Sequence, residues 1–306
     1  MAIKQVRVQI NGTWTTLSLN PSTGKYEATI AAPPITSFGL SGGYYPVVVE
    51  ASDMAGNITT KTHTDSTLGE SLKLKVKEVT KPVITILSPS PGSFLTNGTV
   101  AIKAQLRDES NGSGIAIGTL KLVLNGTTYT NTSPGMTVTQ VTGGYDITFT
   151  KSLSDGIYDA YIDVSDNDGN AAARRAVGFT VDTVPPTLTI TNPTDSTTYT
   201  NVNTIVVSGK TTDTTSGNVL VTITNGSDLY KGILPDGSGN FSESINLRAG
   251  TNTIVIRATD AAGKFSEVTR TVILDTVAPT VKAVTIAPNP VNTGASFTIS
   301  IDASDV

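Results

Sequence analysis

The chain of 306 residues has no cysteine, one histidine and one tryptophan, and 15% of its residues carry a charge. Without cysteine, no disulfide can join its segments. The single histidine, His63, lies in the polar stretch "TKTHTDST", where we expect an exposed loop residue. No Cys–His pair, phosphate-binding P-loop or HExxH zinc motif is present. The sequence therefore predicts no catalytic residue and no cofactor.

Carboxylates stand close together in two places, as a glycoside hydrolase would require. Asp108 and Glu109 precede "SNGSG", and Asp163, Asp166 and Asp168 surround one turn. Both groups are better interpreted as solvated turn residues, because each lies among Gly, Ser and Asn. We therefore expect the chain not to be an enzyme.

Long runs of basic residues and long runs of apolar residues are also missing. The net charge is −4 without any basic run, which argues against a nucleic-acid partner. No stretch reaches the roughly 18 apolar residues of a membrane helix, so we expect no membrane insertion. The opening "MAIKQVRVQINGTW" has no apolar core of a secretory signal. We expect either a trimmed chain or release by another route, such as host lysis.

Short alternating runs are what the sequence does contain. In "YDAYIDVSD", Tyr158, Ala160, Ile162 and Val164 are expected to face inward while the residues between them face outward. Asn-Gly, Asp-Gly and Gly-Gly pairs interrupt such runs, and no long helical period is found. This pattern predicts an all-β protein.

One segment recurs three times without a gap: "GYYPVVVEASDMAGN" at 43–57, "GIYDAYIDVSDNDGN" at 156–170 and "GTNTIVIRATDAAGK" at 250–264. Each predicts a strand followed by a tight turn, because Asp can bond its own backbone and Gly accepts positive φ. Tyr45 and Tyr158 occupy the position of the tyrosine corner that ties a loop to a sandwich strand. Asn252 replaces the tyrosine in the third copy.

An Asn-Gly pair precedes each copy and follows a short apolar run. These pairs, each a strong hairpin signal, are Asn11-Gly12, Asn125-Gly126 and Asn225-Gly226.

Proline-containing phrases separate the copies, as in "VDTVPPTLTI" at 181–190 and "LDTVAPTVKA" at 274–283. Proline lacks a backbone donor and holds the chain extended, so these phrases predict short, stiff joints. The spacing predicts tandem β-sandwiches at 82–184 and 185–277. Residues 1–81 are expected to form an incomplete domain that begins near the third strand, and 278–306 a partial domain with the first two strands.

The phrases "DTVPPTLTITNP", "IRATDAAGKFSEVTRTVILDT" and "VEASDMAGN" resemble tandem bacterial immunoglobulin-like repeats. The resemblance implies tandem immunoglobulin-like β-sandwiches, which occur in surface adhesins, in accessory modules of polysaccharide-degrading enzymes and in phage tail and virion proteins. The opening 30 residues resemble phage-encoded immunoglobulin-like proteins. Such modules are reused widely, so the resemblance is specific for fold and poor for function.

The two ends leave two alternatives open. Residues 1–81 could form a shorter sandwich and residues 278–306 could continue in further chain. Alternatively, the C-terminal strands of one subunit could complete the open N-terminal domain of the next, because exposed sheet edges invite pairing. Subunits of the same chain are therefore expected partners, beside other virion or tail proteins.

Candidate contact residues are few. Trp14 and Tyr44 are candidates for stacking on a sugar ring of a cell-surface glycan or for anchoring a partner, although core or rim roles are the common alternative. Calcium is an open alternative to the prediction of no metal site. "SDNDGN" at 165–170 echoes half an EF-hand loop, and Asp182 or Asp275 could meet Asp108 or Asp213 at a junction.

The sequence as a whole favours a non-catalytic structural and adhesive protein. The leading hypothesis is a phage tail or virion accessory protein whose modules attach weakly and multivalently to a cell surface. The alternatives are the stalk of a bacterial surface adhesin and the carbohydrate-binding accessory region of a secreted polysaccharide-degrading enzyme. Each places the protein in a virion or at the cell exterior.

Overall fold

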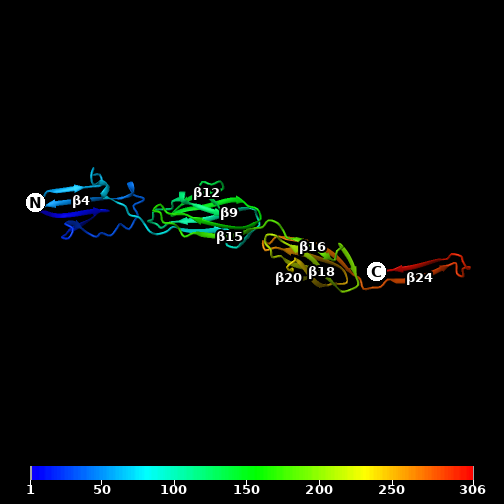
Figure 1. Cartoon of the computed structure of the whole chain (residues 1–306). Coiled ribbons are helices and arrows are strands. Elements are labelled where there is room, and N and C mark those ends of the chain that lie inside the picture. Colours follow the sequence, from blue (N-terminus) through cyan, green and yellow to red (C-terminus); the bar gives the residue numbers. More distant parts are fainter. Residues whose placement is uncertain (1, 306) are drawn as a thin grey trace. The chain divides into compact units, whose positions relative to one another are not determined.

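The computed structural model describes residues 2–305, apart from the side chain of Lys231. The chain divides into two compact units, residues 1–181 and 182–306, and we describe each by itself. Strands dominate both units (Figure 1). The helical elements of the described chain are three short 3-10 turns, η1 (Ser41–Gly43), η2 (Gly69–Leu72) and η3 (Ile117–Thr119). None of the described helices has the length and apolar character needed to cross a membrane.

Residues 2–81 form one sheet with the order β3-β2-β1-β4-β5, and β6 also pairs with β4. Its strands are β1 (Ile3–Ile10), β2 (Thr13–Asn20), β3 (Lys25–Glu27), β4 (Tyr45–Asp53), β5 (Ile58–Lys61) and β6 (Lys73–Leu74). One face is apolar and carries Val6, Val8, Ile10, Val47 and Val49, since residues two apart share a face. No second sheet covers this face within the described part of the segment.

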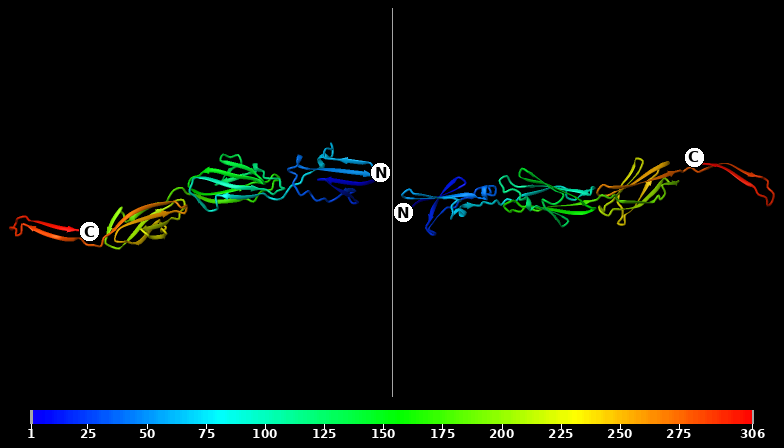
Figure 2. Two further views of the ribbon diagram at one scale, coloured as in Figure 1. Left: turned by 180° about the vertical axis from the view of Figure 1, so that it is seen from behind. Right: turned by 90° about the horizontal axis from the view of Figure 1, so that it is seen from above.

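The second half of the first unit is a two-layer sandwich (Figure 2, green). One sheet has the order β12-β13-β9-β7 and the other β11-β10-β14-β15-β8. The strands of the first sheet are β7 (Val83–Ser88), β9 (Thr99–Arg107), β12 (Met136–Val141) and β13 (Gly144–Ser152). Those of the second are β8 (Ser93–Leu95), β10 (Lys121–Leu124), β11 (Thr127–Tyr129), β14 (Gly156–Asp163) and β15 (Arg175–Val181).

Alternation along these strands builds the core of the sandwich. On β14 the inward residues Ala160 and Ile162 are 1% and 0% exposed, as the alternating sequence predicts, and Val164 follows at 3%. Large, fully buried side chains of this core come from both sheets, which shows that the two inner faces interdigitate; they include Ile102, Leu106, Leu122, Ile147, Phe149, Ile162 and Phe179.

The second unit contains a similar sandwich (Figure 2, gold). Its sheets have the orders β16-β18-β21 and β17-β23-β22-β19-β20. The first comprises β16 (Thr187–Asn192), β18 (Thr204–Thr212) and β21 (Asn240–Asn246). The second comprises β17 (Thr197–Thr200), β19 (Leu220–Asn225), β20 (Asp228–Ile233), β22 (Gly250–Thr259) and β23 (Phe265–Leu274). Ile223, Ile245, Ile254, Ile256 and Val272 fill its core.

Both sandwiches close one sheet with a short parallel pair. β8 runs parallel to β15, and β17 runs parallel to β23, whereas every other strand pair described is antiparallel. The early strand of each sandwich is therefore hydrogen-bonded directly to its last strand.

The last two strands, β24 (Thr280–Ala287) and β25 (Thr298–Ser304), pair with each other and with no other strand of the described chain. The register places Val284 opposite Ile301 and Ile286 opposite Ile299, so these four side chains share one face. All four are at least 45% exposed, which leaves the hairpin with an apolar face that nothing described covers.

The predicted Asn-Gly hairpins are all present, and one differs in detail. Asn11-Gly12 and Asn125-Gly126 adopt positive φ at both residues, which is the geometry of a tight type I′ turn. In the third copy the register pairs Asn225 with Asp228, so the turn has moved to Gly226 and Ser227. Asn225 thereby becomes the last residue of β19 and is buried.

The structure confirms the all-β class with sandwiches in tandem. The strands of each sheet come from within one of the ranges 1–81, 82–184, 185–277 and 278–306. The domain boundaries themselves stay a prediction.

Candidate functional site

Tyr44 lies in a cavity of about 490 Å³ at the start of β4. Gln9, Asn11 and His63 also line this cavity, so aromatic rings and side-chain amides face one space. The rings of Tyr44 and His63 lie 5.6 Å apart, and Nζ of Lys73 is 5.2 Å from the centre of the Tyr44 ring. An aromatic ring beside amide groups is a surface to which both the C–H and O–H groups of a sugar can bind.

His63 departs from its expected place in an exposed loop. It is half-buried, and its Nδ1 atom is buried without a hydrogen-bond partner among the described residues. The reason is that the segment after β5 folds back over the start of β4.

Trp14 lies on β2 directly opposite Gln9. Its side chain is 38% exposed, and the Arg7 guanidinium lies 4.3 Å from the ring centre. Arg7 is held in turn by an ion pair of 2.7 Å with Glu50. Because facing residues of paired strands lie on one side of a sheet, Trp14 shares the sheet face of Gln9, which lines the Tyr44 cavity. The two candidates thus share a face, but Trp14 does not line the cavity.

Ser41 also lines this cavity, within the sequence Gly39-Leu40-Ser41-Gly42-Gly43. Its Gly-x-Ser-x-Gly spacing is that of a hydrolase nucleophile. In hydrolases, however, that serine stands on a sharp turn between a strand and a helix. Here it lies in η1, a 3-10 turn that leads directly to β4, so the spacing does not identify a nucleophile.

The predicted tyrosine corners are present. Tyr158 donates from its hydroxyl to the carbonyl oxygen of Ser154 at 2.9 Å, and Tyr45 donates to Ile35 at 3.0 Å. In the third copy, Asn252 replaces the tyrosine bond, because its Nδ2 donates to the carbonyl oxygen of Arg248 at 2.8 Å. Both Tyr158 and Asn252 reach a carbonyl four residues upstream.

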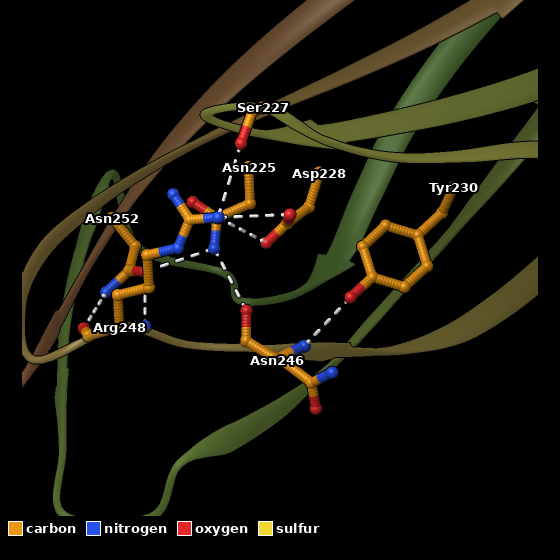
Figure 3. A network of polar contacts seen from close by, with 7 residues as sticks. All are labelled: Asn225, Ser227, Asp228, Tyr230, Asn246, Arg248 and Asn252. Carbon is orange, nitrogen blue, oxygen red and sulfur yellow. Dashed lines mark hydrogen bonds and ion pairs between the residues drawn. The ribbon is translucent and has the colours of Figure 1, made fainter.

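Asn252 is also the centre of a polar network, which Figure 3 shows. Its Oδ1 accepts from the Arg248 backbone at 2.9 Å and from Nδ2 of the buried Asn225 at 3.0 Å. Nδ2 of Asn225 also donates to the Asn246 carbonyl at 3.0 Å. The network therefore joins the end of β19, the end of β21 with the loop that follows it, and the start of β22.

Three carboxylates of the second unit come together: Asp182, Asp213 and Asp260 each offer an oxygen within 4.8 Å of the others. Asp182 is 0% exposed and Asp260 is 6% exposed, while Asp213 is half-buried. Burial, together with the charges of the other two carboxylates, raises the pKa of Asp260. Burial also acts to raise the pKa of Asp213, but hydrogen bonds from Ser216 and Thr215 hold that pKa below its usual value.

A second acidic group lies in the first unit and comprises Glu78, Asp108 and Glu109. The backbone N–H of Gly114 donates to Asp108 at 2.7 Å, and that of Ser113 donates to Glu78. Burial, with a contact to Glu109, raises the pKa of Glu78. Glu78 and Asp108 are half-buried and Glu109 is exposed, yet Oε2 of Glu78 and Oδ1 of Asp108 are also buried without a hydrogen-bond partner among the described residues.

Two family models match the sandwiches. Residues 109–183 match the bacterial Ig-like domain, and residues 186–276 match domain B of glucodextranase. The chain carries tandem immunoglobulin-like domains.

Solved structures of similar architecture include the fibronectin(III)-like modules of CbhA from Clostridium thermocellum, at 14% identity, a TM-score of 0.38 and coverage of 62% of this chain and 93% of that one. A tetra-tandem repeat from the extending region of a large adhesion protein has 16% identity and a TM-score of 0.35, with 98% and 80% covered. A bacterial ice-binding adhesin has 20% identity and a TM-score of 0.30, with 89% and 86% covered. A comparison with curated proteins gave no match.

Two features of these immunoglobulin-like domains were not predicted from the sequence. Asn252 stands where the other copies have tyrosine, and its amide makes the same bond to the backbone. Asp182 and Asp213 were an open alternative for a metal site, whereas Asp260 was expected only in a tight turn. A signal was present, because the turns at Asp53 and Asp166 end in Asn, whereas the turn at Asp260 ends in Lys264.

Proposed function

We propose that the chain is a non-catalytic array of immunoglobulin-like modules that works outside the cell as a spacer and attachment protein. The observation that carries this proposal is the Tyr44 cavity, which is built on a sheet that precedes two well-packed sandwiches. One shallow cavity of this kind gives weak binding. Many copies displayed together gain strength through avidity.

We propose a glycan as the ligand of this cavity. Tyr44 supplies an aromatic ring, while Gln9, Asn11 and His63 supply hydrogen-bond donors and acceptors. Trp14, on the same sheet face, extends the aromatic surface, although Arg7 already covers one side of its ring. The match of residues 186–276 to a module of a glucan-degrading enzyme is compatible with a role close to polysaccharide.

We propose three settings for such a protein, in order of preference. A phage tail or virion is our first candidate and rests on the resemblance of the opening 30 residues. The stalk of a bacterial surface adhesin is the second, and an accessory region of a polysaccharide-degrading enzyme is the third. Mass spectrometry of purified phage particles and of cell-wall fractions from the source would separate them, because the chain should be enriched in one fraction.

The binding proposal is tested with the full chain coupled to beads and offered intact bacteria and purified cell-surface polysaccharides. We expect Tyr44→Ala to lower the retained signal at least tenfold. The control is Tyr199→Ala, because Tyr199 is a 73% exposed residue of β17 and lies outside the cavity. Equal retention of the Tyr44→Ala and parent chains would refute the cavity as the attachment site.

A second copy of the chain is a further proposed partner. The apolar face of the β24–β25 hairpin is exposed, and the half-buried apolar face of the β1–β4 sheet has no second sheet over it among the described residues, so the hairpin of one copy could complete the cover of this face in another. Sedimentation velocity over a hundredfold concentration range tests this. Ile299→Asp should abolish concentration-dependent association, whereas a chain that sediments as a monomer throughout would rule association out.

A further inference from the structure

Two of the clustered carboxylates in the second unit have a buried oxygen without a partner. Oδ2 of Asp182 and Oδ2 of Asp260 have no hydrogen-bond donor among the described residues. Asp213 is the third member of the cluster, and one oxygen from each side chain lies within 4.8 Å of the other two. We propose that Asp182, Asp213 and Asp260 bind one calcium ion.

The unpartnered oxygen of Asp260 has a cause in the sequence. In the equivalent turns, Asp53 and Asp166 each receive a side-chain bond of 2.8 Å to Oδ2 from the Asn four residues later. At this position the third copy has Lys264, whose backbone donates to Oδ1 of Asp260 at 2.8 Å. Oδ2 is left buried without a donor, in a carboxylate that has one oxygen within 4.8 Å of the other two side chains of the cluster.

The remaining oxygens hold the cluster in position. Oδ1 of Asp213 accepts from the backbone of Thr215 at 2.8 Å and of Ser216 at 2.7 Å. Each of Asp213 and Asp260 therefore uses Oδ1 to fix its own loop, and Oδ2 is not needed for that contact. Carboxylates that are already held in place lose little conformational freedom when they bind an ion.

The charge of the cluster is not balanced within the structure. Among the described side chains, no Lys or Arg forms an ion pair with any of the three carboxylates. Adjacent buried carboxylates repel one another, and the raised pKa of Asp260 reports that repulsion together with burial. A bound cation would offset both the repulsion between the carboxylates and the cost of burying their charges.

Calcium is the ion that suits these donors. All three are hard carboxylate oxygens, and Ca²⁺ takes six to eight oxygen ligands at about 2.3–2.6 Å. Two ligands on opposite sides of such an ion are then about 4.6–5.2 Å apart, which is compatible with the 4.8 Å limit of the cluster. Asp213 also lines an open hollow of about 560 Å³, so one member of the cluster borders solvent.

Such an ion would tie together three segments that no strand pairing joins. They are the start of the unit at Asp182, the loop after β18 at Asp213 and the turn between β22 and β23 at Asp260. Calcium should therefore raise the thermal stability of this sandwich and slow amide exchange in these segments.

The test uses the full chain after EDTA treatment and dialysis. Differential scanning calorimetry and hydrogen exchange are measured with no metal, with 5 mM Ca²⁺ and with 5 mM Mg²⁺. We expect Ca²⁺ to raise a melting transition and to slow exchange at 182–186, 213–218 and 260–264, with a smaller response to Mg²⁺. Isothermal titration calorimetry then gives the affinity and the number of ions bound.

Two variants locate the site. Asp260→Asn keeps the Oδ1 acceptor for Lys264 and should weaken this calcium site at least tenfold. Asp53→Asn changes the same position of a turn outside the cluster and should bind as the parent does. Calcium at Glu78, Asp108 and Glu109 would survive Asp260→Asn and so cannot imitate the loss. Absence of any calcium response in the parent, or an unchanged response in Asp260→Asn, would overturn the proposal.

Discussion

Replacing Asn252 by Ala tests whether one buried amide holds the end of the second sandwich together. The Asn252 side chain is 2% exposed and makes five hydrogen bonds. Two of them reach buried strand groups, Nδ2 of Asn225 at 3.0 Å and the carbonyl of Val272 at 3.3 Å. The other three reach the backbone of Arg248 and Gly250, which is exposed, so water can replace the lost partner there.

The expected loss of unfolding free energy follows from counting the buried and the exposed partners of Asn252 separately. A buried group that loses its partner costs about 1 kcal/mol or more, and an exposed group costs a few tenths. The sum for Asn252→Ala is about 3 kcal/mol of unfolding free energy. Because Asn225 keeps its bond to the Asn246 carbonyl, the coupling between Asn225 and Asn252 should be about 1 kcal/mol.

The assay is guanidinium unfolding of the full chain, with hydrogen exchange by mass spectrometry to assign each transition to its sheets. Asn225→Ala, Asn252→Ala and the double variant complete a thermodynamic cycle, and the exposed Asn203→Ala serves as control. Exchange should accelerate in β22 and β23 while β9 and β13 keep the parent rate. A loss below 1 kcal/mol for Asn252→Ala would refute the view that the amide replaces the tyrosine corner.

Three further outcomes can be measured on the same chain. Tyr158→Phe removes the hydroxyl of the corner bond and should cost about 1 kcal/mol in the first sandwich, leaving the second unchanged in hydrogen exchange. Gly144→Ala should lower the free energy of unfolding by several kcal/mol, because φ is +150° and the new Cβ would lie 2.0 Å from the carbonyl oxygen of Leu106. The control is Gly118→Ala, whose new Cβ would meet no atom within 4 Å and which should melt as the parent does. In chelator, Asp260→Asn should be more stable than the parent at pH 7. Burial and the adjacent carboxylates raise the pKa of Asp260 in the folded state, so its ionisation lowers stability as the pH rises through that pKa. The advantage of Asp260→Asn should therefore vanish below about pH 4, and an advantage that persists there would contradict this cause.

Most of the fold could be predicted because its signals are local. Alternation marks the strands, as Ala160 and Ile162 on β14 show, and Asn-Gly marks the hairpins. These signals need no knowledge of distant residues. The shift of the third turn to Gly226 and Ser227 could not be predicted, because it depends on the burial of Asn225 beside Asn252.

The site was harder to predict because it depends on residues far apart in the chain. Trp14 and Tyr44 were predicted singly as aromatic residues near turns, and their relation through Gln9, which pairs with Trp14 and lines the Tyr44 cavity, follows from the folded sheet. The half-buried position of His63 depends on the path of the chain after β5. Three aspartates separated by tens of residues meet only once both sheets have formed.

The parallel pairs β8–β15 and β17–β23 have a mechanical consequence. Tension on the two ends of the chain pulls β8 or β17 toward its N-terminal end and β15 or β23 toward its C-terminal end. Because the paired strands are parallel, these two forces act in opposite directions along the shared strand axis. The ladder hydrogen bonds between them are then sheared all at once instead of being unzipped singly. The register has four residue pairs in the second sandwich and three in the first, so the first should be the earlier to rupture when the chain is stretched.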